Sequence, residues 1–310
     1  MSVVLENQEV RVKGVVQGVG FRPTVYRLAT ECQLHGEVCN DSDGVLIRLS
    51  GIGHNIQSFL QRLQTEAPPL AKIDSIQAAV IDAPWHYQNF SISHSRHIAG
   101  HTEVTADAAS CSACLQEMLD PQERRYLYPF TNCTHCGPRL SIIRGIPYDR
   151  PFTTMAAFPM CAACRAEYDN PLDRRFHAQP IACHDCGPRL SIHGEEGLTD
   201  AQMADVATSR SHSPAATRTA QQLQRIIDTL RAGKIVAIKG LGGFHLCCDA
   251  RNHQAVELLR QRKHRYAKPF ALMSDDLDCI RLYCEVSALE EAQLTSVAAP
   301  IVLLASKAAT

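Results

Sequence analysis

The chain has 310 residues, of which 45% are apolar and 20% are charged, and its formal net charge is −1. This length predicts two or three domains, and the near-zero charge provides no global basic field to attract nucleic acid or anionic lipid. No apolar run approaches the ~18 residues that a membrane span needs. Glu6 and Glu9 stand where a signal peptide would have its apolar core, so we expect a cytoplasmic protein without a membrane partner.

The first ninety residues alternate between strand-like and helix-like patterns. The expected elements, in chain order, are a strand from Glu9, a helix over 25–32, a hairpin turning at 40–44, a helix over 56–63, and strands near 73–81 and 90–93. Apolar residues recur with period two in the strands and at i, i+3, i+4 and i+7 in the helices. The order β-α-β-β-α-β predicts a ferredoxin-like sandwich.

A glycine-rich loop, GVVQGVGFRP at residues 14–23, joins the first strand to the first helix. Backbone N–H groups in such a loop, added to those of the helix N-terminus, form a cradle for an anion. Arg22 offers a fork of donors that matches phosphate oxygens, and Pro23 suits the first helical position. On the glycines alone, a plain tight turn is the simpler interpretation.

The longer string VKGVVQGVGFR closely resembles the acylphosphatase motif, and the resemblance covers residues 1 to about 93. It implies that Arg22 clamps the phosphate of an acyl phosphate and that Asn40 orients the attacking water, so these two are the expected catalytic residues. Taken alone, Asn40 would be interpreted as the first residue of the turn NDSDG. The resemblance also implies a phosphate-binding loop made by Gly14, Gln17, Gly18, Val19, Gly20 and Phe21.

The string CGPRLSI occurs twice, at 136–142 and 186–192, within a repeat of 50-residue period. The repeat runs over 111–142 and 161–192, and arginine pairs at 124–125 and 174–175 also match. Each copy has two Cys-x-x-Cys corners with 18 residues between them. The eight cysteines are Cys111, Cys114, Cys133, Cys136, Cys161, Cys164, Cys183 and Cys186.

This spacing fits a four-cysteine zinc site. Four thiolates with no open position make a structural centre rather than a catalytic one, so we predict two structural Zn²⁺ ions. The insert between the corners is too short and polar for a core of its own, and the metal should supply most of its folding energy. Redox dithiols and buried apolar cysteines are the alternatives. His135 and His184 lie inside the corners but do not align between the copies, and we interpret them as bystanders.

The last hundred residues again alternate between helix and strand patterns, which predicts an α/β layer. The expected elements are an amphipathic helix over 223–230, a buried strand in KIVAIKG at 234–240, a helix capped by Asn252, and a strand after KHRYAKP at 263–269. Without further information, the cations of KHRYAKP are an ordinary helix C-terminus and His245 is a half-buried histidine.

Two strings in this region resemble the YrdC-like nucleotide-binding family. KHRYAKP is similar to its Lys-x-Arg…Lys-Pro motif, and KGLGGFHLCCDA is similar to its first strand and glycine turn. The resemblance implies that Lys263 and Arg265 contact ATP phosphates, with Lys268 nearby. It also implies a pocket for a small acid that is lined by Lys239, Gly242, Gly243 and His245.

The order of these parts resembles the HypF family, the carbamoyltransferases of NiFe-hydrogenase maturation. It implies hydrolysis of carbamoyl phosphate, then formation of a carbamoyl-adenylate from ATP with Mg²⁺. A partner maturation protein would accept the carbamoyl group on its C-terminal cysteine for cyanide-ligand synthesis. The predicted fold is multidomain α+β: an acylphosphatase-like domain at 1–93, a linker at 94–107, zinc modules at 108–145 and 146–195, a linker at 196–216, and the first half of an α/β YrdC-like domain at 217–310.

The resemblance stops within the YrdC-like domain, so we expect only the first step in this chain and marginal stability for residues 220–310. Two other functions stay open. One is a stand-alone acylphosphatase with an inert zinc appendage. The other is a zinc-ribbon module that binds nucleic acid or protein through its arginine pairs, against which stand the net charge and the 6% aromatic content.

Overall fold

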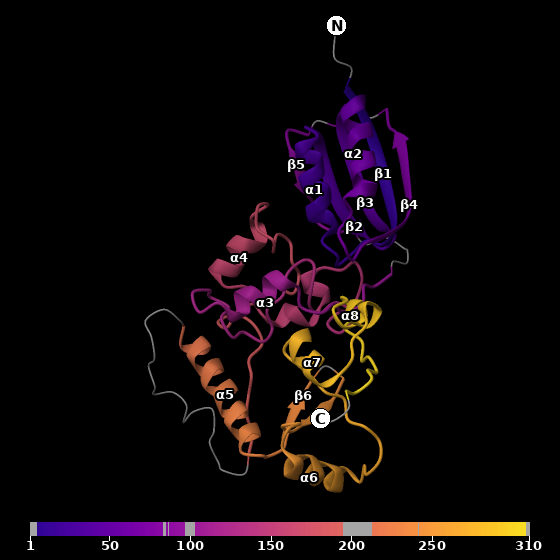
Figure 1. Cartoon of the computed structure of the whole chain (residues 1–310). Coiled ribbons are helices and arrows are strands. Elements are labelled where there is room, and N and C mark those ends of the chain that lie inside the picture. The colour runs from indigo at the N-terminus through magenta and orange to yellow at the C-terminus, as the bar shows by residue number, and fades with distance from the viewer. Residues whose placement is uncertain are drawn as a thin grey trace. The chain divides into compact units, whose positions relative to one another are not determined.

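The computed structural model describes residues 5–82, 85, 87–96, 103–194, 213–240 and 242–307 (Figure 1). The chain divides into two compact units, of which unit 1 comprises residues 1–125 and 129–188, and unit 2 comprises residues 126–128 and 189–310. Residues 97–102 of the predicted linker at 94–107 and residues 196–212 of the predicted linker at 196–216 lie outside the described residues. None of the described helices is long and apolar enough to cross a membrane.

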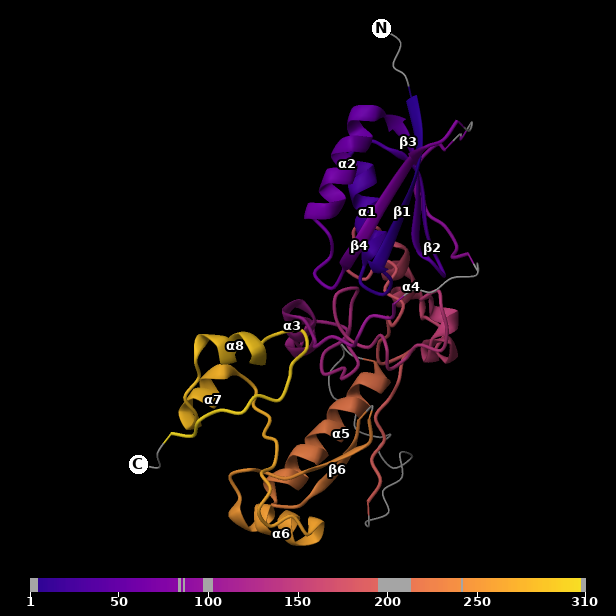
Figure 2. The ribbon, with the colours of Figure 1, turned by 90° about the vertical axis from the view of Figure 1, so that its right-hand side faces the viewer.

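Unit 1 begins with a five-stranded sheet in the order β4-β1-β3-β2-β5. Its elements are β1 (Leu5–Val15), α1 (Phe21–Glu31), β2 (His35–Asp41), β3 (Gly44–Ile52), α2 (Gly53–Thr65), β4 (Lys72–Val80) and β5 (Phe90–Ile92). The predicted order of strands and helices is confirmed, and the short β5 runs parallel to β2 at the edge. The helices α1 and α2 cover one face of the sheet (Figure 2).

The core of this sandwich follows from the two periodicities. Val10 and Val12 of β1 point to the same face because side chains alternate along a strand, and both are fully buried. Val25, Leu28 and Phe59 bring the apolar stripes of α1 and α2 onto that face. The sheet and its two helices therefore share one hydrophobic core.

The remainder of unit 1 has little regular structure. It contains α3 (Ser112–Leu119), α4 (Ala162–Asp169) and two 3₁₀ turns, η1 (Arg150–Phe152) and η2 (Thr154–Ala157). α3 begins directly after Cys111 and α4 directly after Cys161, so the first cysteine of each copy is the N-cap of its helix. The buried clusters here consist mainly of the cysteines themselves, with Ala178 and Ile181 in the second copy.

Unit 2 differs from the sequence prediction in three places. Its elements are α5 (Pro214–Arg231), β6 (Val236–Lys239), β7 (Phe244–Cys247), α6 (His253–Lys263), α7 (Leu277–Tyr283) and α8 (Ala288–Leu294). α5 begins before the predicted stripe because Ser213 accepts a hydrogen bond from the Ala216 amide and caps it. Asn252 caps α6 through the Ala255 amide, as expected.

The predicted buried strand at 234–240 is wrong in its length and its environment. β6 has four residues and pairs only with β7 among the described strands, so it lies in a two-stranded ribbon in which three of its four residues are exposed. Phe244 is consequently 69% exposed. The strand predicted after residue 268 is also absent from the described residues, since Arg260 donates to the Arg265 and Lys268 carbonyls and folds this segment back on α6.

Candidate phosphate site and four-cysteine centres

The loop between β1 and α1 has the backbone conformation that the glycines predict. Gly18 and Gly20 have φ angles of 75° and 80°, a region where a residue with a Cβ is strained. Gly20 is the N-cap of α1, and no side chain caps this helix. Its first-turn N–H groups therefore carry the partial positive charge that attracts an anion. The helix begins at Phe21, which puts Pro23 at its third position rather than the first.

Arg22 and Asn40 lie against each other at this loop. With its amide oxygen toward Arg22, Asn40 accepts hydrogen bonds from the arginine Nε and Nη2, both at 3.3 Å. Asn40 is only 1% exposed and Arg22 is 8% exposed. The guanidinium group also donates to the Ser95 hydroxyl at 3.3 Å and to the Asp149 carboxylate at 2.7 Å. The two predicted catalytic side chains are thus brought together in a buried position.

A small cavity of about 20 Å³, which is room for about one water molecule, lies beside this pair. The predicted residues that line it are Gly18, Gly20, Phe21, Arg22 and Asn40.

Three other loop residues that the resemblance assigned to phosphate binding do not line the cavity and have structural roles. Gly14 lies inside β1 at a bulge, where a Cβ would be 2.2 Å from the Lys72 carbonyl oxygen. Val19 is fully buried in the sandwich core. The amide of Gln17 donates to the Asp41 and Gly44 carbonyls and so holds the β2–β3 turn against the loop. These residues shape the loop and do not line the cavity.

The region of unit 1 that contains the two cysteine quartets, here called the cysteine-containing region, supplies half of the residues that line the cavity. The sequence analysis did not predict this contribution. The lining residues from this region are Thr134, Arg139, Tyr148, His177, Ala178, Gln179 and Pro180. Apart from Arg139, which belongs to the doubled string, they carry no sequence signal that points to this site. They approach the glycine loop only through the tertiary fold.

Burial changes the ionisation of two of these lining groups. Burial raises the pKa of Tyr148 to about 12, and the phenol stays neutral. Burial, together with the positive charge of Arg22, lowers the pKa of His177 to about 4. Imidazole and phenol are therefore both uncharged near pH 7, and Arg22 supplies positive charge to the cavity.

The cysteine-containing region sits directly on the glycine loop. A Cβ on Gly20 would lie 3.2 Å from the Thr134 side chain, and one on Gly18 would lie 3.2 Å from Arg139. Arg139 is 1% exposed; it donates to the Gly18 carbonyl and to the Cys133 and Cys136 carbonyls in the second cysteine corner of the first module. The glycines are thus needed for close packing as well as for the loop conformation.

The eight cysteines form the two predicted quartets, in which all four Sγ atoms lie within 4.8 Å of one another. A tetrahedral Zn²⁺ with bonds of about 2.3 Å requires S···S separations of about 3.8 Å. The first quartet has separations of 3.7, 3.7 and 3.5 Å, and the second has 3.7, 3.8 and 3.6 Å. Both quartets fit a four-thiolate zinc centre, and neither contains His135 or His184.

Backbone and side-chain donors surround the sulfur atoms. The His135 amide donates to Cys133 Sγ at 3.4 Å and the Cys164 amide donates to Cys161 Sγ at 3.5 Å. Donors that point at a sulfur atom stabilise its thiolate, which is the metal-binding form.

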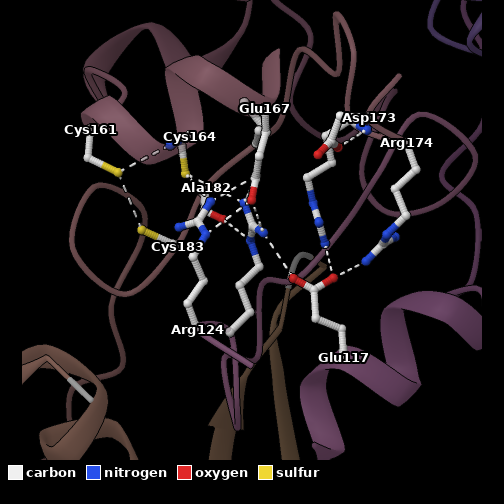
Figure 3. Close-up of polar contacts among 12 residues, drawn as sticks. Glu117, Arg124, Cys161, Cys164, Glu167, Asp173, Arg174, Ala182 and Cys183 are labelled. Carbon is white, nitrogen blue, oxygen red and sulfur yellow. Dashed lines mark hydrogen bonds and ion pairs between the residues drawn. The ribbon is translucent and has the colours of Figure 1, made fainter. Parts of the chain in front are cut away.

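The arginine pairs of the repeat are engaged inside the protein (Figure 3). Arg125 and Arg175 are 1% and 4% exposed. Both form ion pairs with Glu117, at 2.9 Å and 2.5 Å. Burial alone would raise the pKa of Glu117, but the hydrogen bonds and charges of these arginines outweigh it and lower the pKa. Arg124 and Arg174 are about one-third exposed, but they also pair with Glu167 and Glu117, respectively. These ion pairs argue against the alternative in which the arginine pairs bind nucleic acid.

In unit 2 the predicted residues form two separate groups. Lys239, Gly242, Gly243 and His245 lie in the β6–β7 ribbon, and the Lys239 ammonium is 6.0 Å from the Phe244 ring centre. Lys263, Arg265 and Lys268 lie at the end of α6 and just beyond it, where Arg265 donates to the Pro269 carbonyl at 2.7 Å. Within the described residues of unit 2, no hydrogen bond or ion pair joins the two groups.

Comparisons with known proteins cover almost the whole chain. Residues 8–92 match the family described as Acylphosphatase, residues 111–143 and 160–193 match the HypF finger, and residues 228–310 match the Sua5/YciO/YrdC family described as Telomere recombination. The acylphosphatase of Mannheimia succiniciproducens is 38% identical over 84 residues, which are 27% of this chain and 92% of that protein. The fold and these matches define a multidomain protein with an acylphosphatase domain, two zinc-finger modules and part of a YrdC-like domain.

Longer relatives identify the combination. The carbamoyltransferase HypF of Synechocystis sp. is 48% identical over 305 residues, which are 98% of this chain and 37% of that protein. A crystal structure of full-length HypF in the phosphate- and nucleotide-bound form is similar with a TM-score of 0.87 and 43% identity, over 99% of this chain and 38% of that one. The chain belongs to the HypF family, and it spans a little over a third of the length of these relatives.

Proposed function

We propose that this chain hydrolyses carbamoyl phosphate at the glycine loop, as the first step of carbamoyl transfer in NiFe-hydrogenase maturation. The observation that carries the proposal is the buried contact between Arg22 and Asn40 beside an uncapped helix N-terminus, in a chain of the HypF family. The relatives' name supports carbamoyl transfer as the wider activity, and the phosphate- and nucleotide-bound relative supports phosphate and nucleotide as ligand types.

The chemistry requires no covalent intermediate. Loop N–H groups and the Arg22 guanidinium offset the charge of the phosphoryl group, which is the main source of rate enhancement in phosphoryl transfer. Asn40 holds a water in line with the bond to be broken. The water oxygen bonds to phosphorus, the bond from phosphorus to the carbamoyl oxygen breaks, and the products are carbamate and dihydrogen phosphate.

The later steps are proposed for the family and involve unit 2. Lys263, Arg265 and Lys268 would hold ATP phosphates, with Mg²⁺ as the counterion, and the ribbon from Lys239 to His245 would receive carbamate. The product is a carbamoyl-adenylate, from which the carbamoyl group passes to the C-terminal cysteine of a partner maturation protein in the cytoplasm. We propose two structural Zn²⁺ ions, one in each cysteine quartet, which fix the region that covers half of the phosphate cavity.

Phosphate release from carbamoyl phosphate tests the first step. Arg22→Ala should lower the rate by about 100- to 1,000-fold because it removes the clamp. Arg27→Ala is the matched control, since Arg27 lies on the same helix and forms exposed ion pairs with Glu31 and Glu66. Equal activity of the Arg22→Ala variant would refute the assigned site. Equal rates with benzoyl phosphate would favour the broad, stand-alone acylphosphatase.

A further inference from the structure

The two cysteine modules exchange arginine side chains (Figure 3). Arg124 of the first module donates from Nη2 to Cys164 Sγ of the second module at 3.3 Å, and from Nε to Glu167 at 3.1 Å. Arg174 stands 50 residues later in the second module. It donates from Nη1 to Cys114 Sγ of the first module at 2.9 Å and pairs with Glu117. Each arginine therefore donates a hydrogen bond to a cysteine of the other module.

The second arginine of each pair also reaches the other module, where its side chain donates to a backbone carbonyl. Arg125 donates from Nε to the Ala182 carbonyl at 2.8 Å, and Arg175 donates from Nε to the Asn132 carbonyl at 2.9 Å. Ala182 and Asn132 each precede the second cysteine corner of the opposite module, and their positions also differ by 50. A contact from i to j that is matched by a contact from j to i is the signature of a two-fold interface. The repeat thus forms a pseudo-dimer within one chain.

The chemistry of the quartets gives this exchange a role. Four thiolates around Zn²⁺ leave a net charge of about −2, and hydrogen bonds from neighbouring groups offset such charge and orient the ligands. Arg124 and Arg174 provide charged donors at 3.3 and 2.9 Å, while Glu167 and Glu117 hold the same guanidinium groups through ion pairs. Those donors come from the other copy in both cases.

We propose that Arg124 and Arg174 are positioning residues for the metal centre of the opposite module, so that each copy of the repeat protects the thiolates of the other. Loss of Arg124 weakens the hold of the second quartet on its metal, and loss of Arg174 weakens the hold of the first. Both side chains are about one-third exposed, so that their replacement leaves the buried Arg125 and Arg175 in place to support the fold.

The test measures alkylation of each cysteine in the purified chain, loaded with zinc, by peptide mass spectrometry over time with N-ethylmaleimide. A thiolate bound to zinc reacts slowly, so its alkylation rate reports release of the metal. Arg124→Gln should raise the rates of the second quartet about 10- to 100-fold, the usual effect of removing a group that orients a metal ligand. Arg174→Gln should do the same for the first quartet only. Cys279 and Cys284 provide internal references within the same samples.

Arg165→Gln is the matched control, because Arg165 follows Cys164 directly on α4 but pairs with Asp169 and contacts no sulfur in the described structure. It should leave both quartets unchanged. The crossed pattern distinguishes positioning from a loss of folding, which would expose both quartets together. Equal acceleration of both quartets, acceleration of the variant's own quartet, no acceleration, or a purified chain that binds no zinc would each overturn the proposal.

Discussion

Asp149 should compete with phosphate for Arg22. Its carboxylate lies 2.7 Å from Arg22 Nη2, and the two side chains are 19% and 9% exposed. Phosphate bound at the glycine loop needs the same guanidinium group and is repelled by the carboxylate. Asp149→Asn keeps the shape of the side chain and removes its charge. A hydrogen bond between charged groups contributes about 1.5–3 kcal/mol, so we expect the Kd of inorganic phosphate to fall about 10- to 100-fold.

Isothermal titration with inorganic phosphate measures this effect without turnover. Asp169→Asn is the control, since Asp169 is 59% exposed on α4 and its closest approach to a cation is 3.9 Å. Unchanged or weaker phosphate binding by Asp149→Asn would refute the reasoning. It would mean that Asp149 holds Arg22 in the orientation that phosphate requires, rather than competing for it.

Two further predictions concern stability. Because His177 has a pKa of about 4 in the folded chain against about 6.5 when unfolded, the unfolded state binds more protons between these values, and stability is lost as pH falls from about 6.5 to 4. Urea unfolding should lose about 2 kcal/mol between pH 7 and 5 relative to the same change in His177→Gln, and parallel pH profiles would contradict this. Chelation of zinc should remove the circular dichroism of α3 and α4 but leave the fluorescence of Trp85 unchanged, because its indole packs on Arg48 of the sandwich at 5.3 Å. A red shift of that emission on chelation would show that the sandwich unfolds with the cysteine region.

The sandwich was predictable because its signals are local. Strand alternation, helical stripes and the NDSDG turn each follow from a few neighbouring residues, and they agree with one another. The cysteine quartets were predictable for a similar reason, since metal-ligand spacing constrains the chain directly. Arg22 and Asn40 needed the additional resemblance to acylphosphatases, because an arginine and an asparagine at these positions have ordinary interpretations as well.

The rest of the site depends on contacts between distant segments. Tyr148, Asp149 and His177 lie in irregular segments more than a hundred residues after Arg22. No periodic pattern in the sequence indicates that these side chains approach it. The length and burial of the strand predicted at 234–240 were overestimated for a related reason. An apolar run indicates a strand that can be buried, but only neighbouring strands determine whether it is, and β6 has one such neighbour among those described.

The arginines that reach from each copy of the repeat to the other also make the two copies depend on each other. Arg125 of the first copy pairs with Glu167 of the second copy at 2.5 Å as well as with Glu117 of its own copy at 2.9 Å, so deletion of one copy would uncover the buried side chains of the other and remove part of their partners. Gene duplication is ordinarily reversible, because a redundant copy can drift or vanish. Here each copy supplies ion-pair partners to the other, so loss of one copy would also change the copy that stays.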